Sequence, residues 1–372
     1  MASRSVAYLS LQGTHEGQAA HAHVHEIVDG LRRRGWNVQL LAPEYRGPRV
    51  STARRVWTFV VLQARAVPRL KSFGAVYIRT HFASLPTAAM ARLLGIPVVL
   101  EVNGPHDDMF IAWPQLRVLG GLLTWAVRAQ IRWADAVIAV TEGLRDWVRR
   151  EVPGKGASVV PNGANTQLFR PDAVRPSSLP QDYVAFAGAL ARWQGIETML
   201  AALDDRAWPE SVSLAIAGSG ELEGSVRRRS AEDRRLVYLG RIPYALVPGL
   251  LAGSLAGIVA KNALGGREST GLAPLKMYEA LACGVPAIVS DFPGQADLVR
   301  EGGCGIVIPP ESPADLAKAV AFLHDHPEKR LEMGKKGRAL VESAHSWDAR
   351  AAATAEVLER VLAKRGRRRR RT

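Results

Sequence analysis

The 372-residue chain is 47% hydrophobic and 23% charged, and it carries a formal net charge of +14. This composition excludes fibrous, collagen-like and largely disordered proteins, and the length favours two domains over one. The two cysteines, Cys283 and Cys304, exclude a disulfide-stabilised scaffold and fit a reducing compartment.

The first part of the chain alternates short β-branched runs with helical patterns. The runs "VAYL", "VQLLA", "AVYI", "VVLEV" and "AVIAV" are typical of strands, and helical patterns separate them. Continuous apolar strands indicate a parallel sheet that is covered by helices on both faces. We therefore predict a Rossmann-like N-terminal domain over residues 1–165.

A proline-rich segment then breaks this alternation. The stretch "VVPNGANTQLFRPDAVRPSSLPQD" contains four prolines, so we expect an interdomain linker at residues 166–182. Strand-like runs resume with "YVAFAGAL", "VSLAIAGSG", "AGIVA" and "PAIVS". They predict a second Rossmann-like domain over residues 183–345. The expected fold is α/β, with two doubly wound domains facing a central cleft.

The end of the chain has two segments of different character. Residues 346–363 begin at Ser346, a suitable helix cap, and carry alanine and leucine at helical spacing. No strand follows this predicted helix, so we expect it to cross back over the other domain. Residues 364–372 are almost wholly basic. They predict a disordered tail that is either attracted to an anionic surface or simply solvated.

The stretch "STGLAPLKMYEALACGVPAIVSD" predicts a short helix with charged residues near its start. Pro274 suits the first turn and Gly284 suits the position after the end, which bounds the helix at about ten residues. A helix N-terminus beside the carboxyl ends of parallel strands binds anions. Lys276 is thus suited to a phosphate and Glu279 to the hydroxyls of a ribose. The spacing of these two residues fits a surface ion pair equally well.

Five segments extend this pattern over nearly the whole chain. They are "AHVHEIVDGLRRRGWNVQLLAP", "VVPNGANTQLFRP", "FAGALARWQGIETML", "GLAPLKMYEALACGVPAIVSD" and "GGCGIVIPPESPADLAKAV". In this order they resemble the family 4 glycosyltransferases, which have the GT-B fold and transfer a sugar from a nucleotide carrier with retention of configuration. The resemblance implies that the C-terminal domain binds a nucleotide-sugar donor and the N-terminal domain binds the acceptor.

The resemblance assigns the donor site residue by residue, with three departures. Glu279 matches the glutamate that holds the ribose, but the first glutamate of the family's Glu-x7-Glu motif falls on Gly271. Ala189 and Gln194 stand where the family has an arginine and a lysine that bind the diphosphate. The "PLK" and "WQG" segments resemble a branch with other residues at these places, in which Lys276 would supply the charge. The predicted donor set is Gly188, Arg192, Gln194, Gly195, Lys261, Arg267, Gly271, Leu272, Lys276 and Glu279.

The N-terminal domain is expected to supply the acceptor side. Strand-end residues face the ligand in such domains, and here they include Arg79, His81, Glu101, Asn103 and His106. Asn103 aligns with a histidine that contacts the transferred sugar in many relatives, but an amide orients a hydroxyl and is not a base. His106 is a candidate for the same sugar or acceptor, or a cap of its loop. The predicted acceptor set is Gly17, His23, Arg79, His81 and Asn103, and the predicted catalytic set is Asn103, His106 and Lys276.

Three histidines in "HAHVH" invite a metal interpretation. On a helix, His21 and His25 lie on one side and His23 on another, so the three do not converge. His23 also matches a histidine near the family's acceptor loop, which is "THEGQAAH" here. We expect no metal and no cofactor, since the nucleotide sugar is itself a substrate.

Two stretches combine basic and apolar residues, "RVSTARRVWTFVVLQARAVPRLKSF" and "QLRVLGGLLTWAVRAQIRW". The longest apolar run of the chain lies in the second stretch and has only about half of the ~20 residues that span a bilayer. Both stretches suit helices in a membrane interface, and both suit core helices with solvated arginines. Since the N-terminus lacks a signal-peptide pattern, we expect a cytoplasmic protein with peripheral contact at the inner face of the membrane. Nucleic acid is not an expected partner.

The predicted function is that of a retaining glycosyltransferase in cell-surface polysaccharide or glycoconjugate synthesis. It would move a hexose-type sugar from a UDP or GDP sugar to a hydroxyl of a glycan, a lipid-linked or a small-molecule natural-product acceptor. In a front-face mechanism the leaving phosphate takes the acceptor proton, so no strong protein base is needed. The alternative is a degenerate protein of the same fold that binds a nucleotide or an anionic polymer without turnover, which the residue at 271 leaves open.

Overall fold

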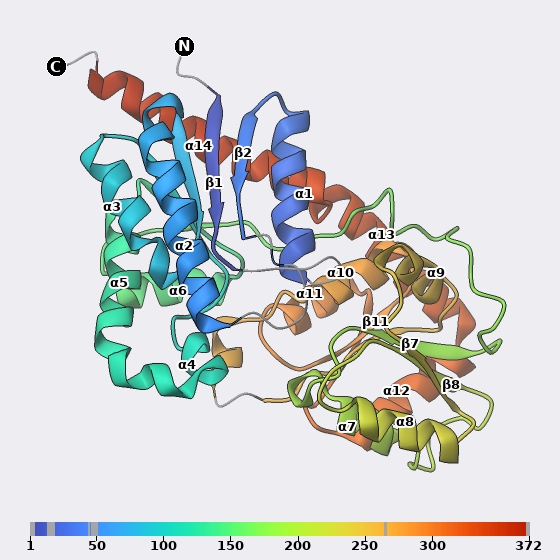
Figure 1. Cartoon of the computed structure of the whole chain (residues 1–372). Coiled ribbons are helices and arrows are strands. Elements are labelled where there is room, and N and C mark those ends of the chain that lie inside the picture. Colours follow the sequence, from blue (N-terminus) through green and yellow to red (C-terminus); the bar gives the residue numbers. More distant parts are fainter. Residues whose placement is uncertain (1–3, 13–18, 44, 46–50, 264–265, 370–372) are drawn as a thin grey trace. The chain divides into compact units, whose positions relative to one another are not determined.

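The computed structural model describes residues 4–12, 19–43, 45, 51–263 and 266–369, which form two compact units (Figure 1). The first unit comprises Met1–Pro161 and Asp348–Thr372, and the second comprises Asn162–Trp347. Each unit has a six-stranded parallel sheet with helices packed on it. The predicted fold class of two Rossmann-like α/β units is therefore confirmed.

The sheet of the first unit has the strand order β2-β1-β3-β4-β5-β6. Its core contains fully buried strand side chains such as Leu9, Ile78 and Leu100. Strands β1 and β4 are buried along their whole length, as expected for parallel strands under two helical layers. The strands are β1 (Ser5–Ser10), β2 (Asn37–Leu41), β3 (Ala75–Arg79), β4 (Val98–Val102), β5 (Ala136–Ala139) and β6 (Ser158–Val159).

Helices connect these strands, and α2 and α6 begin at side-chain caps. Ser51 accepts a hydrogen bond from the backbone N–H of Arg54 at the start of α2, and Thr141 accepts one from Leu144 at the start of α6. The helices are α1 (Ala19–Arg33), α2 (Thr52–Ala66), α3 (Leu85–Leu93), α4 (Asp108–Ala112), α5 (Gly120–Trp133) and α6 (Glu142–Glu151), with the 3₁₀ helices η1 (Val67–Ser72), η2 (Phe82–Ser84) and η3 (Pro114–Leu119).

The last helix, α14 (Trp347–Arg369), returns to the first unit, as predicted (red in Figure 1). An ion pair of 2.8 Å joins Asp348 to Arg33 of α1. The expected change from helix to disordered tail at residue 364 is wrong for the described residues, because the helix continues to Arg369. Arg365 anchors this extension by donating a hydrogen bond of 3.0 Å to the carbonyl of Gly74. Residues 370–372 lie outside the described residues.

The sheet of the second unit has the strand order β12-β11-β10-β7-β8-β9. Residues 166–182 precede it as turns and extended chain without a helix or strand. The strands are β7 (Tyr183–Ala187), β8 (Ser213–Ala217), β9 (Leu236–Gly240), β10 (Gly257–Val259), β11 (Ala287–Ser290) and β12 (Gly305–Ile308). The helices are α7 (Ile196–Ala202), α8 (Glu223–Glu232), α9 (Val247–Ala252), α10 (Leu275–Ala282), α11 (Gln295–Gly302), α12 (Pro313–Asp325) and α13 (Pro327–Ala344), with η4 (Arg192–Gln194), η5 (Tyr244–Leu246) and η6 (Arg267–Thr270).

The strand order of each sheet reverses beside the first strand of its unit. The reversal lies between β1 and β3 in the first unit and between β7 and β10 in the second. In open α/β sheets, ligands bind beyond the carboxyl ends of the strands at such a point. Candidate residues from the sequence lie there: Arg79 ends β3, Asn103 follows β4, Gly188 follows β7 and Lys261 comes shortly after β10.

Among the helices of the described residues, none is both long and apolar enough to cross a bilayer.

Candidate active site

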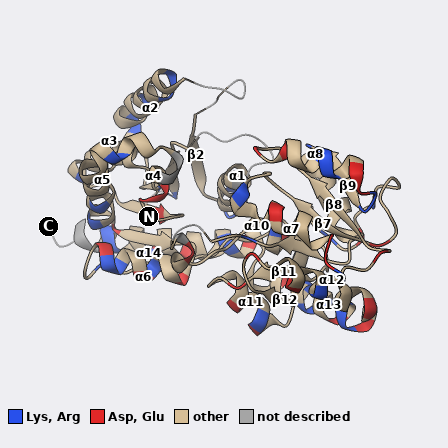
Figure 2. Cartoon of the chain, turned by 90° about the horizontal axis from the view of Figure 1, so that it is seen from below, with Lys and Arg blue, Asp and Glu red and all other residues tan. Residues whose placement is uncertain are grey.

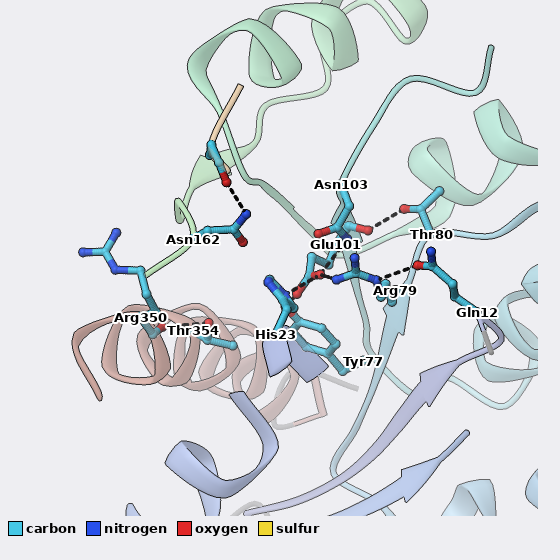
Figure 3. Close-up of polar contacts among 11 residues, drawn as sticks. Gln12, His23, Tyr77, Arg79, Thr80, Glu101, Asn103, Asn162, Arg350 and Thr354 are labelled. Atoms are coloured by element: carbon cyan, nitrogen blue, oxygen red, sulfur yellow. Dashed lines mark hydrogen bonds and ion pairs between the residues drawn. The ribbon is translucent and has the colours of Figure 1, made fainter. Parts of the chain in front are cut away.

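The first unit holds a buried carboxylate at the end of β4. Glu101 lies in the strand sequence "VVLEV", and its side chain is 2% exposed. Burying an ionised carboxylate in an apolar strand costs free energy unless charged and hydrogen-bonding partners surround it. The surroundings of Glu101 supply such partners (Figure 3).

Four side chains contact the Glu101 carboxylate. His23 Nε2, Arg79 Nη1 and Asn103 Nδ2 lie 2.9, 2.9 and 2.6 Å from Oε1. The Tyr77 hydroxyl donates to Oε2 at 2.5 Å. These donors come from α1, β3 and the residue after β4, so the cluster joins three elements of the first unit. Of the predicted acceptor set, the structure thus brings together His23, Arg79 and Asn103.

The electrostatics of this cluster keep Glu101 ionised. Burial alone would raise the pKa of Glu101, but the charge and hydrogen bond of His23, with Arg79 and Tyr77, outweigh it and hold the pKa well below its usual range. A carboxylate that accepts several hydrogen bonds and has a low pKa is a poor proton acceptor near neutral pH. Glu101 is therefore suited to holding its neighbours in place and unsuited to acting as a base.

Asn103 presents the open end of this cluster. Its Nδ2 group donates to Glu101, whereas Oδ1 has no hydrogen-bond partner among the residues that the structure describes. The side chain is half-buried just beyond the carboxyl end of β4. Asn103 therefore offers a carbonyl oxygen, a hydrogen-bond acceptor, at the edge of the sheet where a ligand is expected.

Two predicted histidines lie outside this cluster. His81 Nδ1 accepts a hydrogen bond from the backbone N–H of Ala83, and burial lowers the pKa of His81 to about 4. His106 has Nδ1 2.9 Å from Asp107 Oδ1 and Nε2 3.2 Å from Glu151 Oε2. These contacts match the alternative in which His106 holds its loop in place. The catalytic role of His106 stays a prediction.

The "HAHVH" histidines separate as the sequence predicts. The rings of His21 and His25 lie against each other with their centroids 4.1 Å apart, whereas His23 faces Glu101. Within the described residues, no group of three metal-ligating side chains converges. Gly17, the remaining predicted acceptor residue, lies outside the described residues.

In the second unit, α10 carries the charged pair found in the sequence. The helix begins at Leu275, directly after Pro274, and ends at Ala282, with Gly284 at a positive φ of 71°. Every residue of α10 is buried except the half-buried Lys276. The exposed surface ion pair that the spacing also allowed is therefore wrong.

Lys276 extends from the first turn of α10 towards the end of β7. Its Nζ donates to Gln194 Oε1 at 2.9 Å and lies 4.0 Å from the centroid of the Phe186 ring. A Cβ atom at position 188 would come within 2.7 Å of this Nζ, so Gly188 leaves the room that the ammonium occupies. Burial, followed by repulsion from Lys261, lowers the pKa of Lys276 well below its usual value, although Glu279 acts in the opposite direction.

Glu279 lies one turn further along α10 and is almost fully buried. The Tyr244 hydroxyl, from η5, donates to its Oε1 at 2.7 Å, and no other described residue hydrogen-bonds to this carboxylate. Burial raises the pKa of Glu279 to about 7, against the effects of the Tyr244 hydrogen bond and the Lys276 charge. Among the described residues, the Glu279 carboxylate thus has a single hydrogen-bond donor.

The other predicted donor cations lie on the loops after β7 and β10. Lys261 Nζ lies 4.5 Å from the centroid of the Trp193 ring, which is a cation–π contact. Arg192 is exposed at the start of η4. The side chain of Arg267 is outside what the structure describes. Lys276 and Lys261 are thus close enough for their charges to repel, an arrangement that an anion would stabilise.

The predicted glycines of the donor set have two distinct roles. Gly195 has φ 71° and ψ 25°, and a Cβ atom there would lie 1.6 Å from the carbonyl oxygen of Ala260, so it allows η4 to pack against the end of β10. Gly271, where a glutamate is expected, has φ 80° and ψ 152°. This conformation strains any residue with a side chain. Position 271 therefore favours glycine over any residue with a Cβ atom.

Sequence reasoning placed Glu101 among the ligand-facing strand-end residues but in none of the predicted sets, and it gave no role to Tyr77 or Tyr244. A carboxylate inside an apolar strand run is itself a signal, because such a group is stable only with partners. The two tyrosines carry no comparable signal, since their partners are distant in sequence and only the fold brings them together.

Two family models match the chain, one over most of each unit. The model of glycosyltransferase family 4 matches residues 20–168, and the model of glycosyl transferases group 1 matches residues 172–340. Both units of the chain are thus covered, in the order that the resemblance in the sequence implies.

Individual proteins agree with these models. The chain is 26% identical to an alpha-maltose-1-phosphate synthase of Mycolicibacterium smegmatis, over 92% of this chain and 96% of that protein. It is 27% identical to a GDP-mannose-dependent alpha-(1-6)-phosphatidylinositol monomannoside mannosyltransferase of Mycobacterium tuberculosis, over 73% and 72%.

The structure also superposes on that of Anabaena Alr3699/HepE in complex with UDP-glucose. The TM-score is 0.71 at 18% identity, over 95% of this chain and 99% of the other. This likeness confirms the predicted GT-B fold class. With both units matched by family models, the chain belongs to the family 4 glycosyltransferases.

Proposed function

We propose that this glycosyltransferase moves a hexose-type sugar, with retention of configuration, from a UDP or GDP sugar to a hydroxyl of a glycan, lipid-linked or small-molecule acceptor. The observation that carries the proposal is the half-buried Lys276 with the buried Glu279 near the start of α10, beside the carboxyl ends of β7 and β10. A cation at a helix N-terminus and a carboxylate short of donors together complement a nucleoside diphosphate.

The two residues of the pair would bind different parts of the nucleotide-sugar donor. Lys276, repelled by Lys261, gains stabilisation when a diphosphate lies between or beside the two ammonium groups. Glu279 gains hydrogen-bond donors when the ribose brings its two hydroxyls to the carboxylate. Gln194 holds the Lys276 ammonium from the other side. This arrangement replaces the arginine and lysine that the family has at positions 189 and 194.

The chemical step needs no protein base. The bond between the anomeric carbon and the diphosphate oxygen breaks, with its electron pair going to the diphosphate. The acceptor oxygen bonds to the same face of the anomeric carbon, and its proton passes to the leaving phosphate. Lys276 would stabilise the charge that develops on the diphosphate, and Asn103 would orient the transferred sugar. We propose that the reaction uses no metal or other cofactor.

Two apolar surfaces of the first unit support peripheral contact with a membrane. On α2, Trp57 is 69% exposed and lies beside Val56 and Val60, which are also exposed. The segment from η3 into α5 exposes a second set, which is Trp113, Val118, Leu119, Leu122 and Trp125. Helices α2 and α5 both pack against α3. Exposed tryptophan and leucine on neighbouring helices are suited to insertion into a lipid interface.

Charge on the same segments complements anionic lipid. Residues 51–100 and 109–134 contain no Asp or Glu, whereas Arg54, Arg65 and Arg117 are exposed. Figure 2 shows blue but no red on α2 and α5. The mannosyltransferase relative is named for a phosphatidylinositol acceptor, which is a lipid. We therefore favour a lipid-linked acceptor at the inner face of the membrane.

Vesicle flotation tests this location with a matched pair of variants. Leu122 on α5 and Leu331 on α13 are both 60% exposed. Leu122→Ser should reduce binding to vesicles of phosphatidylcholine and phosphatidylglycerol several-fold, and Leu331→Ser should leave it unchanged. Equal binding by the two variants, or binding that does not depend on phosphatidylglycerol, would contradict the proposed membrane contact.

Donor turnover tests the function itself. The protein is incubated with UDP-, GDP-, ADP- and TDP-sugars, and slow release of the nucleotide is measured. We expect release from a UDP or GDP sugar, and loss of that release in Glu279→Gln. Tight nucleotide binding without turnover on any acceptor would instead favour the degenerate alternative, which the glycine at position 271 supports.

A further inference from the structure

We propose that Glu101 is a positioning residue that fixes the amide of Asn103 with its carbonyl oxygen outward, so that the first unit selects a sugar hydroxyl as hydrogen-bond donor. The inference rests on the proposed function, in which Asn103 contacts the sugar. It adds the residue that sets the polarity of this contact, and Glu101 was in none of the predicted sets.

The orientation of the amide follows from the charge of its neighbour. Asn103 Nδ2 lies 2.6 Å from Glu101 Oε1. An amide NH₂ group donates and a carboxylate only accepts, so the reverse orientation would place two acceptors against each other. Glu101 therefore decides which end of the Asn103 side chain points away from the carboxylate (Figure 3).

The partners of Glu101 make this orientation firm. Arg79 Nη1 and His23 Nε2 bind the same Oε1 atom, and the Tyr77 hydroxyl binds Oε2. These contacts hold the carboxylate rigidly on β4 and leave it ionised. A rigid acceptor on a strand is a precise support for a ligand-binding side chain.

The outward carbonyl restricts the ligand group that fits. Asn103 Oδ1 has no partner among the described residues, so a ligand at this edge of the sheet meets an acceptor and must supply a donor. A hydroxyl of a sugar supplies one, whereas an ionised phosphate or carboxylate does not. The first unit thus discriminates against anionic groups at this position.

The hydrogen bond can be observed without turnover. The chain has five asparagines, so labelling them with ¹⁵N gives at most five pairs of side-chain NH₂ signals in an NMR spectrum. The Asn103 signal, identified by its loss in Asn103→Ala, should move in Glu101→Gln. It should stay in place in Tyr77→Phe, which removes only the contact to Oε2. The amide of Asn162, which donates to the carbonyl of Ala273 in the second unit, is an internal control.

Exchanging the carboxylate of residue 101 with the amide of residue 103 tests whether the orientation of the Asn103 amide matters for catalysis. In Glu101→Gln the side chain of residue 101 can donate as well as accept, so it no longer forces the carbonyl oxygen of Asn103 outward. In Asn103→Asp the carboxylates of residues 101 and 103 repel each other. We expect each single variant to lower kcat about tenfold or more with little change in the KM for the donor, since it removes one oriented hydrogen bond. The double variant pairs a glutamine NH₂ with an aspartate oxygen and again leaves an acceptor outward. It should recover part of the lost kcat, because Arg79 and His23 also donate to the position that the glutamine NH₂ would take.

Three results would overturn the inference. They are an Asn103 signal that does not move in Glu101→Gln, a double variant no faster than the slower single variant, and single variants that change only stability. If the wild-type protein turns over no donor, the proposed function fails. The NMR comparison then still decides whether Glu101 orients Asn103.

Discussion

The two units each bury one glutamate near the carboxyl ends of their strands, and the two carboxylates are in opposite states. Glu101 in the first unit accepts contacts from four side chains, and its pKa lies well below the usual range. Glu279 in the second unit accepts a hydrogen bond from Tyr244 alone among the described side chains, and its pKa is raised to about 7.

The difference indicates different roles for two similarly buried groups. Burial raises the pKa of both carboxylates, so the number of donors decides the charge. Glu101 has all its donors within the protein, which makes it part of the scaffold that holds Asn103. Glu279 has only the Tyr244 hydroxyl as a donor among the described residues, which suits it to the hydroxyls of a ligand.

The largest effect should come from removing the satisfied carboxylate. Glu101→Ala leaves the buried Arg79 and His23 without their counter-charge, and it should lower the free energy of unfolding by about 3–5 kcal/mol. Glu279→Ala, which removes a carboxylate with one donor, should cost about 1–2 kcal/mol. Urea unfolding monitored by circular dichroism compares the two variants. Equal losses would remove the distinction between the two glutamates.

The next effect concerns nucleotide affinity. Glu279→Gln keeps the shape of the side chain but weakens its hydrogen bonds to the ribose, so the Kd for UDP or GDP should rise about 10- to 100-fold. Isothermal titration calorimetry of the full chain measures this change. Glu279→Gln should leave the unfolding midpoint near that of the wild type, and a fall in affinity that only tracks lost stability would count against a ribose contact.

The pH dependence of nucleotide binding should be smaller but specific. Because the pKa of Glu279 is about 7, the carboxylate is mostly protonated at pH 6 and mostly ionised at pH 8. The ionised form accepts ribose hydroxyls, so affinity should increase about tenfold from pH 6 to pH 8. In Glu279→Gln, the only pH dependence of nucleotide affinity that remains should come from titration of the nucleotide phosphate. A wild-type profile that coincides with that of the variant would contradict the raised pKa.

The smallest effect should come from Tyr244. Tyr244→Phe removes the hydroxyl that lowers the pKa of Glu279, so the midpoint of the pH profile should move to higher pH. At pH 7 the affinity for the nucleotide should fall about three- to fivefold. Titrations between pH 6 and pH 9 measure the midpoint, and Tyr77→Phe in the first unit should leave it unchanged. A midpoint that moves to lower pH would show that Tyr244 does not support the ionised form.

The sequence predicted the fold well because its signals are local. Apolar runs and helical periodicity located the strands, and the residues around Pro274 and Gly284 bounded α10 closely. The predicted end of the last helix at residue 363 was wrong. The run of like charges from residue 364 predicts disorder. In the structure, α14 continues to Arg369, and a hydrogen bond from Arg365 to the carbonyl of Gly74 stabilises this extension.

The site was predicted in part. Helical geometry separated His23 from His21 and His25, and strand-end positions identified Arg79 and Asn103. The pairing of Tyr77 with Glu101, and of Tyr244 with Glu279, depends on segments 24 and 35 residues apart in sequence. Such contacts arise from packing, which no local pattern encodes. The contacts of His106 with Glu151 are distant in the same way.

The most direct test is a titration of UDP and GDP into the wild-type chain and two variants, one from each unit. The account predicts that Glu279→Gln loses affinity for the nucleotide, whereas Asn103→Ala retains it, because the second unit alone holds the nucleoside diphosphate. Loss of affinity in Asn103→Ala with full binding by Glu279→Gln would contradict the assignment of the donor site to α10.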